Sequence, residues 1–255
     1  MRRMKLPQLG GSILRRTLSL VLLLALWEAV ALFAQSRLVP TVGAVFRALA
    51  KEVVSGPLPH HLGVTLLRVA AAFFIAMVIG SVIGVVMGRS RRLDAFFDSW
   101  LVLLLNLPAL VVIVLAYVWF GLTEAAAIGA VAVNKIPTVA VTLREGARAL
   151  DRDLADVARS FRIGRLSNLR HFVLPQLYPF LLAAARSGLA LVWKIVLVAE
   201  LLGRSDGVGF AIQLHFQQFD VPEILAYTVA FTAVVQAIEW GILQPLEQRS
   251  SRWRR

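Results

Sequence analysis

Residues 64–88 read VTLLRVAAAFFIAMVIGSVIGVVMG, a run of 25 residues in which Arg68 is the only charged side chain. A helix rises about 1.5 Å per residue and the hydrocarbon layer of a bilayer is about 30 Å thick, so about 20 apolar residues suffice to cross it. The run is too long for a membrane strand, which needs about 10 residues, and its apolar residues do not alternate with polar ones. This stretch predicts a transmembrane helix.

The rest of the chain repeats this pattern. Of the 255 residues, 58% are hydrophobic and 16% are charged, whereas soluble domains average about 45–50% and about 25%. A soluble core of this size could not bury so much apolar surface, and a disordered chain would not contain it. We therefore expect an all-α, polytopic membrane protein, one transmembrane domain over residues 1–255, with six spans at about residues 18–35, 64–88, 100–121, 124–143, 177–202 and 222–246.

The distribution of basic residues predicts the orientation of these spans. Six spans place both termini on one side, and the segments on that side carry 19 Lys and Arg residues against 4 on the other. Because cationic loops resist translocation, we expect both termini in the cytoplasm and a multi-pass protein of the cytoplasmic (inner) membrane. The net charge of +12 does not indicate nucleic-acid binding, because the arginines flank apolar runs without aromatic residues between them.

The first span has an alternative interpretation as a cleaved signal sequence. Basic residues precede its apolar run, and Ala29-Val30-Ala31 resembles a cleavage site. However, the run continues past this triplet and Glu28 interrupts it. Cleavage would also leave five spans and divide the basic segments between the two sides, so we expect the span to be retained.

The segment between the first two spans, residues 37–63, predicts a helix at the outer membrane interface. Apolar residues recur at helical spacing over residues 42–54, Thr41 is suited to cap the helix, and we expect Arg47, Lys51 and Glu52 on its polar face. The second span carries Gly80, Gly84 and Gly88 on one face of its helix. This spacing predicts close packing against another helix.

No set of residues indicates catalysis or a metal site. The histidines His60, His61, His171 and His215 are scattered over both predicted faces, and the pair His60-His61 lacks an acidic cluster and is more simply part of a loop. The chain has no cysteine and no G-x-x-x-x-G-K-[ST] phosphate loop. We expect no catalytic residue, no metal and no cofactor in this chain, and we set aside a membrane enzyme or a structural scaffold.

The segment between the fourth and fifth spans, residues 144–176, is the most informative. Residues 143–176 read LREGARALDRDLADVARSFRIGRLSNLRHFVLPQ. An amphipathic helix with apolar side chains at residues 150, 154, 157, 158 and 161 is followed by Gly164, which we expect to end it, and by a short second helical turn. The pattern alone favours equally a helix that binds another protein and one that lies on anionic lipid.

This segment resembles the cytoplasmic "EAA" loop of ABC-transporter permeases of the binding-protein-dependent importer class. In that pattern E-A-A is followed by three residues, G, nine residues, I, one residue and L-P. Asp156 stands at the Glu position, Val157-Ala158 at Ala-Ala, and Leu174-Pro175 at Leu-Pro. Arg162 occupies the Gly position, so the turn is expected to move to Gly164.

The resemblance extends along the chain to the nitrate, sulfonate and taurine-type permeases. It is carried, in order, by Val39-Pro40, by HLGVTLLR at residues 61–68, by Trp119-Phe120-Gly121, and by AELLG at residues 199–203 followed by Gly207-Val208-Gly209. No single motif is specific, but their order is.

The resemblance implies a set of partners. Two ATP-binding subunits, a second permease copy that we expect to be identical, and an extracytoplasmic solute-binding protein would work with this chain in the lipid bilayer, with ATP and Mg bound by the ATPase partner. The EAA-like loop would be the coupling helix that sits in a groove of the ATPase. The coupling residues implied are Asp156, Ala158, Phe161, Arg162, Gly164, Leu174 and Pro175.

Charged and polar residues inside the spans are candidates for the translocation pathway, because they are costly in lipid and usually face a cavity or a partner. We expect Lys135 and Lys194 to face the pathway and to favour a small anionic solute; pairing with Glu28, Glu124, Glu200 or Glu239, or snorkelling, is the alternative. The resemblance implies structural or gating roles for Arg186 and Glu200. Asn106, before Leu107-Pro108, is a further pathway candidate; the alternative is that Pro108 makes a kink that serves helix packing.

Two rival functions remain open at this point. An ion- or proton-coupled secondary transporter would use the charges inside the spans without an ATPase, but the chain shows no inverted repeat. An importer of the same class could also carry an uncharged aromatic or heterocyclic solute. The sequence does not identify the solute.

Overall fold

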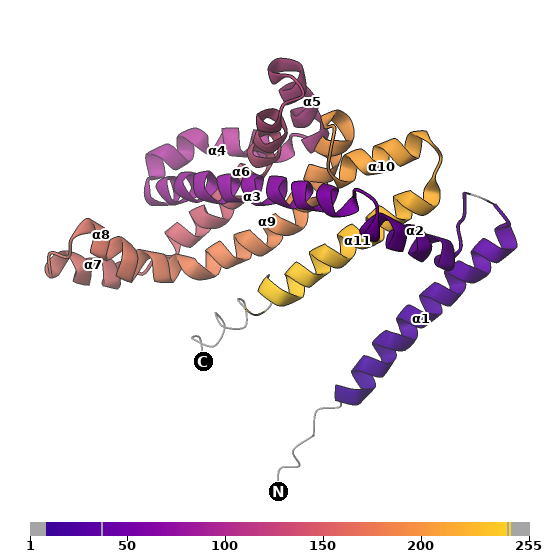
Figure 1. Ribbon diagram of the computed structural model, residues 1–255. Helices are drawn as coiled ribbons and strands as arrows, with labels where there is room; N and C mark the ends of the chain where they lie inside the picture. The colour runs from indigo at the N-terminus through magenta and orange to yellow at the C-terminus, as the bar shows by residue number, and fades with distance from the viewer. Residues whose placement is uncertain (1–8, 37, 244, 246–255) are drawn as a thin grey trace, which may run out of the picture. The chain divides into compact units, whose positions relative to one another are not determined.

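The computed structural model describes residues 9–36, 38–243 and 245, and every regular element within them is helical, which confirms the predicted all-α class (Figure 1). The elements in chain order are α1 (Leu9–Ala34), α2 (Val42–Val54), α3 (Leu58–Arg89), α4 (Arg91–Asn106), α5 (Ala109–Phe120), α6 (Glu124–Arg148), α7 (Arg152–Ser160), α8 (Arg165–Asn168), the π-helical turn η1 (Leu169–Val173), α9 (Leu174–Gly203), α10 (Val208–Gln217), α11 (Val221–Ile238) and the π-helical turn η2 (Glu239–Leu243).

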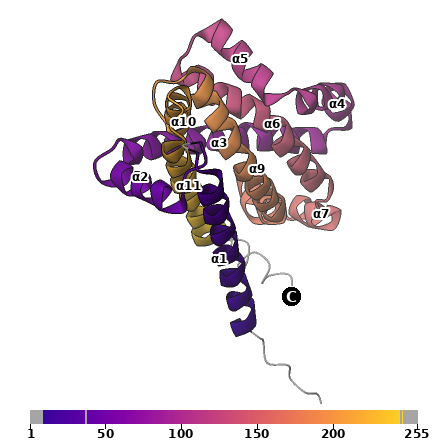
Figure 2. The same cartoon turned by 90° about the vertical axis from the view of Figure 1, so that its right-hand side faces the viewer.

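Five stretches of the described residues are long and apolar enough to cross a membrane, and the bent pair α4–α5 makes a sixth if it counts as one span. The sequence predicted one span at residues 100–121, with a packing kink at Pro108 as an alternative to a pathway role for Asn106. Instead, α4 ends at Asn106 and α5 begins at Ala109, with a bend of 94° between them (Figure 2). The cause is Pro108, which lacks a backbone N–H and disfavours helical backbone at Leu107.

The described helices form two compact units, each with its own buried residues. The first unit contains the described residues up to Leu58 and Ile212–Ala230, and the second contains Pro59–Ala211 and the described residues from Phe231 onward. The prediction of one transmembrane domain remains a prediction.

In the first unit, α2 is the predicted outer helix, and its start is held by two hydrogen bonds. The Thr41 hydroxyl accepts a hydrogen bond from the backbone N–H of Ala44 at 3.2 Å, as predicted for an N-cap. The backbone N–H of Val42 donates to the Glu28 carboxylate of α1 at 2.7 Å. Glu28 therefore joins α1 to α2.

Glu52 does not lie on an exposed polar face of α2 as predicted. It is only 8% exposed, because Tyr227 of α11 covers it and donates a hydrogen bond from its hydroxyl to the Glu52 carboxylate at 2.8 Å. Arg47 and Lys51 are exposed, as expected. A carboxylate can occupy this buried position because its partner comes from a helix distant in the sequence.

In the second unit, the three glycines of α3 pack against α6, which confirms the predicted close approach of two helices. A Cβ atom built at each glycine would lie within 2.9 Å of a Cβ atom on α6: Val139 for Gly80, Leu143 for Gly84 and Ala147 for Gly88. Only glycine permits this separation, because any larger side chain would push the helices apart.

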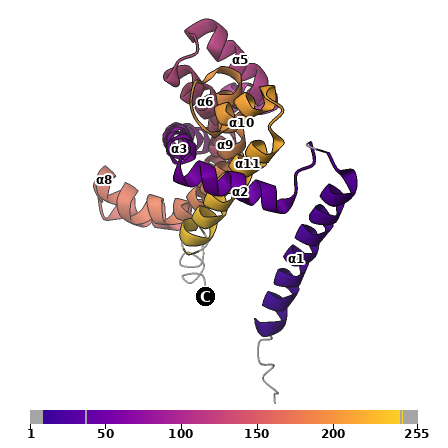
Figure 3. The ribbon, with the colours of Figure 1, turned by 45° about the vertical axis from the view of Figure 1, so that its right-hand side comes forward.

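The core of the second unit continues into the segment between α6 and α9. Leu143 and Ala147 of α6 pack with Val173 of η1 and with Leu177 of α9. Figure 3 shows α8 at the beginning of the long helix that continues into α9. We call residues 152–173, which contain α7, α8 and η1, the α7–α8 segment. Its root is η1, which this packing attaches to α6 and α9.

Candidate functional site

Two groups of residues lie at opposite ends of α3 and form the candidate functional regions. Arg68 lies near the start of α3 and Arg89 at its end, and their separation of 21 positions corresponds to about 30 Å of helix. A buried polar network surrounds Arg68, and the α7–α8 segment lies near Arg89. The two regions are therefore separated by about the thickness of a bilayer core.

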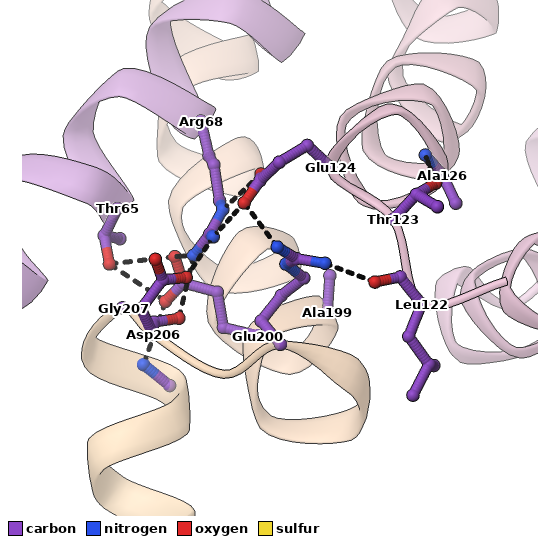
Figure 4. A network of polar contacts seen from close by, with 12 residues as sticks. Thr65, Arg68, Leu122, Thr123, Glu124, Ala126, Ala199, Glu200, Asp206 and Gly207 are labelled. Carbon is purple, nitrogen blue, oxygen red and sulfur yellow. Dashed lines mark hydrogen bonds and ion pairs between the residues drawn. The ribbon is translucent and has the colours of Figure 1, made fainter.

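The polar network is centred on Arg68, which is 3% exposed (Figure 4). Its guanidinium donates to Glu200 at 2.9 Å and to Glu124 at 2.8 Å, and it also contacts the Asp206 carboxylate. Arg204 contacts Glu124 in turn, at 2.6 Å. Three carboxylates are thus held by two arginines, which is how a buried charge avoids an uncompensated desolvation cost.

Glu200, fully buried at 0% exposure, has three kinds of partner. Besides Arg68, its carboxylate accepts hydrogen bonds from the Thr65 hydroxyl at 2.9 Å and from the backbone N–H of Gly209 at 2.9 Å. The Thr65 hydroxyl also accepts from the backbone N–H of Val208 at 2.8 Å. The first turn of α10 is therefore bound to α3 and α9.

Gly207 makes this arrangement possible. Its φ of +101° lies in the region that favours glycine, and a Cβ atom there would lie 2.6 Å from a Glu200 carboxylate oxygen. Its backbone N–H donates to Nδ1 of His61 at 3.0 Å. His61 is therefore part of helix α3 and of this network, not a loop residue as the sequence suggested.

At the other end of α3, helix α7 carries an uncovered apolar stripe. Asp151 caps α7 by accepting from the backbone N–H of Asp153 at 2.8 Å. Of the predicted apolar positions, Ala158 is buried at 3% exposure, whereas Val157 is 42% and Phe161 is 77% exposed. The described residues of this chain therefore leave most of the stripe open to a partner.

The end of α7 differs from the prediction, because the chain reverses at Arg162 and not at Gly164. Arg162 adopts a left-handed φ of +48°. Its backbone N–H donates to the carbonyl of Arg159 at 3.0 Å, and that of Ile163 donates to the carbonyl of Ala158 at 2.9 Å. These two bonds form a Schellman motif, whose left-handed position normally holds glycine.

Comparison with known proteins identifies the family. Residues 67–238 match the model of the binding-protein-dependent transport system inner membrane component. The chain belongs to this family. It is therefore a multi-pass inner membrane permease. Family membership favours the ABC importer over the ion- or proton-coupled secondary transporter that the sequence left open.

Curated relatives of the permease cover most of its length. It is 28% identical to the putative aliphatic sulfonates transport permease protein SsuC of Bacillus subtilis, over 91% of this chain and 84% of the relative. It is 27% identical to the taurine transport system permease protein TauC of Escherichia coli, over 76% and 70%. It is 30% identical to the bicarbonate transport system permease protein CmpB of Synechococcus elongatus, over 67% and 62%.

Solved structures support the same fold. An inward-facing form of the MetNI methionine ABC transporter matches with a TM-score of 0.62 and 19% identity, covering 74% of this chain and 95% of that chain. An amino acid ABC transporter crystallised with histidines matches with a TM-score of 0.61 and 23% identity, covering 79% and 98%.

The residues predicted to couple the permease to an ATPase all lie in or beside the α7–α8 segment. Asp156 forms an ion pair with Arg159 on the exposed surface of α7. Leu174 and Pro175 form the first turn of α9, directly after η1. Phe161, Arg162 and Gly164 follow the end of α7, and their role in coupling stays a prediction.

The predicted pathway residues do not form one site. Lys194 is exposed on α9, Arg186 pairs with Glu239 of η2 at 3.8 Å, and Asn106 is exposed with its amide donating to the carbonyl of Val102 at 2.7 Å. Glu200 is fully enclosed in the polar network. Their roles in transport stay predictions.

Lys135 differs from the other four predicted pathway residues in being buried without a partner within the described part of the chain. It is 2% exposed, and its Nζ has no hydrogen-bond partner among the residues that the structure describes. It lies against Gly188 of α9, where a Cβ atom would come within 2.8 Å of Cε of Lys135. The carboxylates considered as internal partners bind other groups: Glu28 binds Val42, Glu124 and Glu200 bind Arg68, and Glu239 pairs with Arg186.

Sequence reasoning did not find the network around Arg68. It noted the motifs at residues 61–68, 199–203 and 207–209 but did not predict that these segments meet. The network residues that it missed are Thr65, Glu124, Arg204 and Asp206. The available signal was Arg68 itself, because a charge inside a span requires a partner. Which carboxylates supply it depends on three-dimensional packing.

Replacing Arg68 with Met should destabilise the permease by about 3–5 kcal/mol, because Glu200 would remain buried without its counter-charge. The matched variant Arg159→Met removes an exposed pair, with side chains 78% and 65% exposed, and should cost less than about 1 kcal/mol. Thermal unfolding in detergent, followed by size-exclusion fluorescence, compares the two. Equal stability of both variants would show that the network is not structural.

Replacing Arg162 with Gly should stabilise the end of α7 by about 1 kcal/mol, because glycine adopts a left-handed φ without steric cost. Amide hydrogen exchange of α7 should slow in this variant. Gly164→Ala should leave exchange unchanged or slower, since a Cβ atom there has nothing within 4 Å. Faster exchange in Gly164→Ala would instead place the turn at Gly164.

Proposed function

We propose that this permease is the translocating subunit of an ATP-driven importer for a small anion, delivered by an extracytoplasmic binding protein. Support for the solute class comes first from the relatives, whose named solutes are aliphatic sulfonates, taurine and bicarbonate. Each of these solutes carries an acidic group that is ionised at neutral pH. The observation in this chain that carries the proposal is the buried, unpartnered Nζ of Lys135.

A lysine in this position is costly unless something compensates its charge. Burial removes Nζ from water, and the structure supplies no carboxylate to it among the described residues. Gly188 accommodates the Lys135 side chain, since Cε of Lys135 occupies the space that a Cβ atom would take. An anionic solute that reaches Lys135 during transport would supply the missing counter-charge.

The energy for transport comes from partner subunits in this proposal. The chain contains no phosphate-loop motif, so two ATPase subunits would bind ATP and Mg, and a second, identical permease would complete the pathway. The exposed stripe formed by Leu154 and Val157 of α7 and by Phe161 at its C-cap would fit the groove of an ATPase. This arrangement places the α7–α8 segment and both chain termini in the cytoplasm, in agreement with the distribution of basic residues.

A single helical path connects the proposed ATPase contact with the polar network. Residues Leu166–Gly203 form one continuous span of 38 residues. It contains Leu174 near the ATPase contact, Gly188, which lies against Lys135 of α6, and Glu200 in the polar network. A movement of α7 would therefore be transmitted along α9 as a rigid body to the end that holds α10. This is the geometry that alternating access requires: one element whose two ends respond to different partners.

Phe161→Asp should abolish binding of the ATPase partner, because it places a charge at the most exposed side chain of the apolar stripe. Co-purification of the ATPase with tagged permease measures this effect, and we expect a loss of at least about tenfold, equivalent to about 1.4 kcal/mol. Phe46→Asp on α2, at a side chain 52% exposed, is the matched control and should retain the ATPase. Undiminished co-purification with Phe161→Asp would refute the role of α7.

The double variant Lys135→Leu/Lys194→Leu should abolish uptake while leaving complex assembly and basal ATPase activity intact. Proteoliposomes containing the complete transporter and its binding protein would be tested with taurine, an aliphatic sulfonate and bicarbonate. Lys135→Leu alone should account for most of the loss, because Lys194 is exposed, and Lys51→Leu is the control. Unchanged uptake, or uptake of an uncharged aromatic solute only, would refute the anion pathway.

A further inference from the structure

A cavity of about 640 Å³ lies at the end of the second unit where α3 ends and the α7–α8 segment begins. Its buried apolar wall includes Met87 of α3, Ala147 of α6 and Val173 of η1, which are 3%, 6% and 6% exposed. Its polar wall includes Arg89 and Arg91 at the junction of α3 and α4. The cavity belongs neither to the network around Arg68 nor to the surroundings of Lys135.

The charges that line the cavity are unequally compensated. Asp94 is bound by Arg144 at 3.3 Å and by Arg148. For the guanidinium groups of Arg89 and Arg91, by contrast, the structure records no hydrogen bond or ion pair within residues 9–36, 38–243 and 245. Arg89 and Arg91 are both exposed to solvent, and no carboxylate of the described residues, including Asp151 in the cavity lining, pairs with them.

We propose that this cavity binds a phosphate group through Arg89 and Arg91. The planar guanidinium offers paired N–H donors that match the oxygens of a phosphate, so two adjacent arginines suit this ligand better than a carboxylate-sized anion alone. Asn168 adds an amide to the lining. The apolar wall of Met87 and Val173 excludes water from one side of the site and strengthens the ionic contacts.

The position of the cavity identifies an inner-leaflet phospholipid as the source of the phosphate. Arg89 ends a span of the α3 helix, so in the proposed orientation the cavity lies at the depth of the cytoplasmic headgroups. Helix α4 begins at Arg91 and exposes Phe96 and Trp100, which are 65% and 61% exposed. Aromatic side chains of this kind lie at the membrane interface, beside the path of an acyl chain that leaves the cavity.

This site rests on the proposed orientation and not on the identity of the transported solute. A phosphate bound here would hold the ends of α3, α4 and α6 next to the root of the α7–α8 segment. The lipid would thereby stabilise the part of the permease that we propose to meet the ATPase. Its binding can be measured without any transport assay, so failure of one proposal is distinguishable from failure of the other.

The test compares three probes on the purified complete transporter: dioctanoyl phosphatidylglycerol, dioctanoylglycerol without phosphate, and inorganic phosphate. Native mass spectrometry and thermal shift measure binding. We expect phosphatidylglycerol to bind and dioctanoylglycerol not to, and we expect the double variant Arg89→Gln/Arg91→Gln to weaken phosphatidylglycerol binding at least about tenfold, as for the loss of one charge-assisted contact.

Arg92→Gln is the matched control, because Arg92 is exposed on the same turn of α4 but does not line the cavity. It should bind phosphatidylglycerol like the native chain, and Arg89→Lys/Arg91→Lys should keep part of the affinity and so exclude a folding defect. Inorganic phosphate that competes with the lipid, and depends on the same two arginines, would support the site with a soluble source. Equal binding by the double variant and by Arg92→Gln would overturn the proposal.

Discussion

The ion pair between Arg68 and Glu200 is the contact on which one end of the second unit depends. Neither side chain has access to water, at 3% and 0% exposure, so each must be satisfied by the other and by the neighbouring groups. That requirement brings together the start of α3, the end of α9 and the first turn of α10. It also explains Gly207, since a side chain there would occupy the space of the Glu200 carboxylate.

The two ends of the second unit are stabilised by different physical means. At the Arg68 end, hydrogen bonds with defined directions fix the loop before α10 to α3. At the other end, apolar packing of Leu143 and Leu177 holds the root of the α7–α8 segment. The hydrogen bonds at the Arg68 end are directional, whereas the apolar contacts at the other end are not.

The sequence predicted what depends on local pattern. Apolar length located the spans, and Thr41 located the start of α2. The spacing of Gly80, Gly84 and Gly88 predicted close packing against another helix, which the structure shows to be α6. Sequence reasoning failed where contacts join distant segments: Glu52 is buried by Tyr227, and Arg68 meets carboxylates up to 138 residues away. Such partners are set by tertiary packing, which periodicity does not encode.

At Arg162 and at Lys135 the chain keeps a side chain in a locally unfavourable setting, a left-handed backbone in one case and burial without a partner among the described residues in the other. Arg162 keeps the turn where the pattern has glycine, although an arginine must adopt a left-handed φ to do so, so the position of the turn matters more than its local cost. Arg68 and Lys135 are both buried cations, but only Arg68 has carboxylate partners. A cation that the protein itself neutralises supports the fold, whereas one that it leaves without a counter-charge is suited to receive it from a ligand.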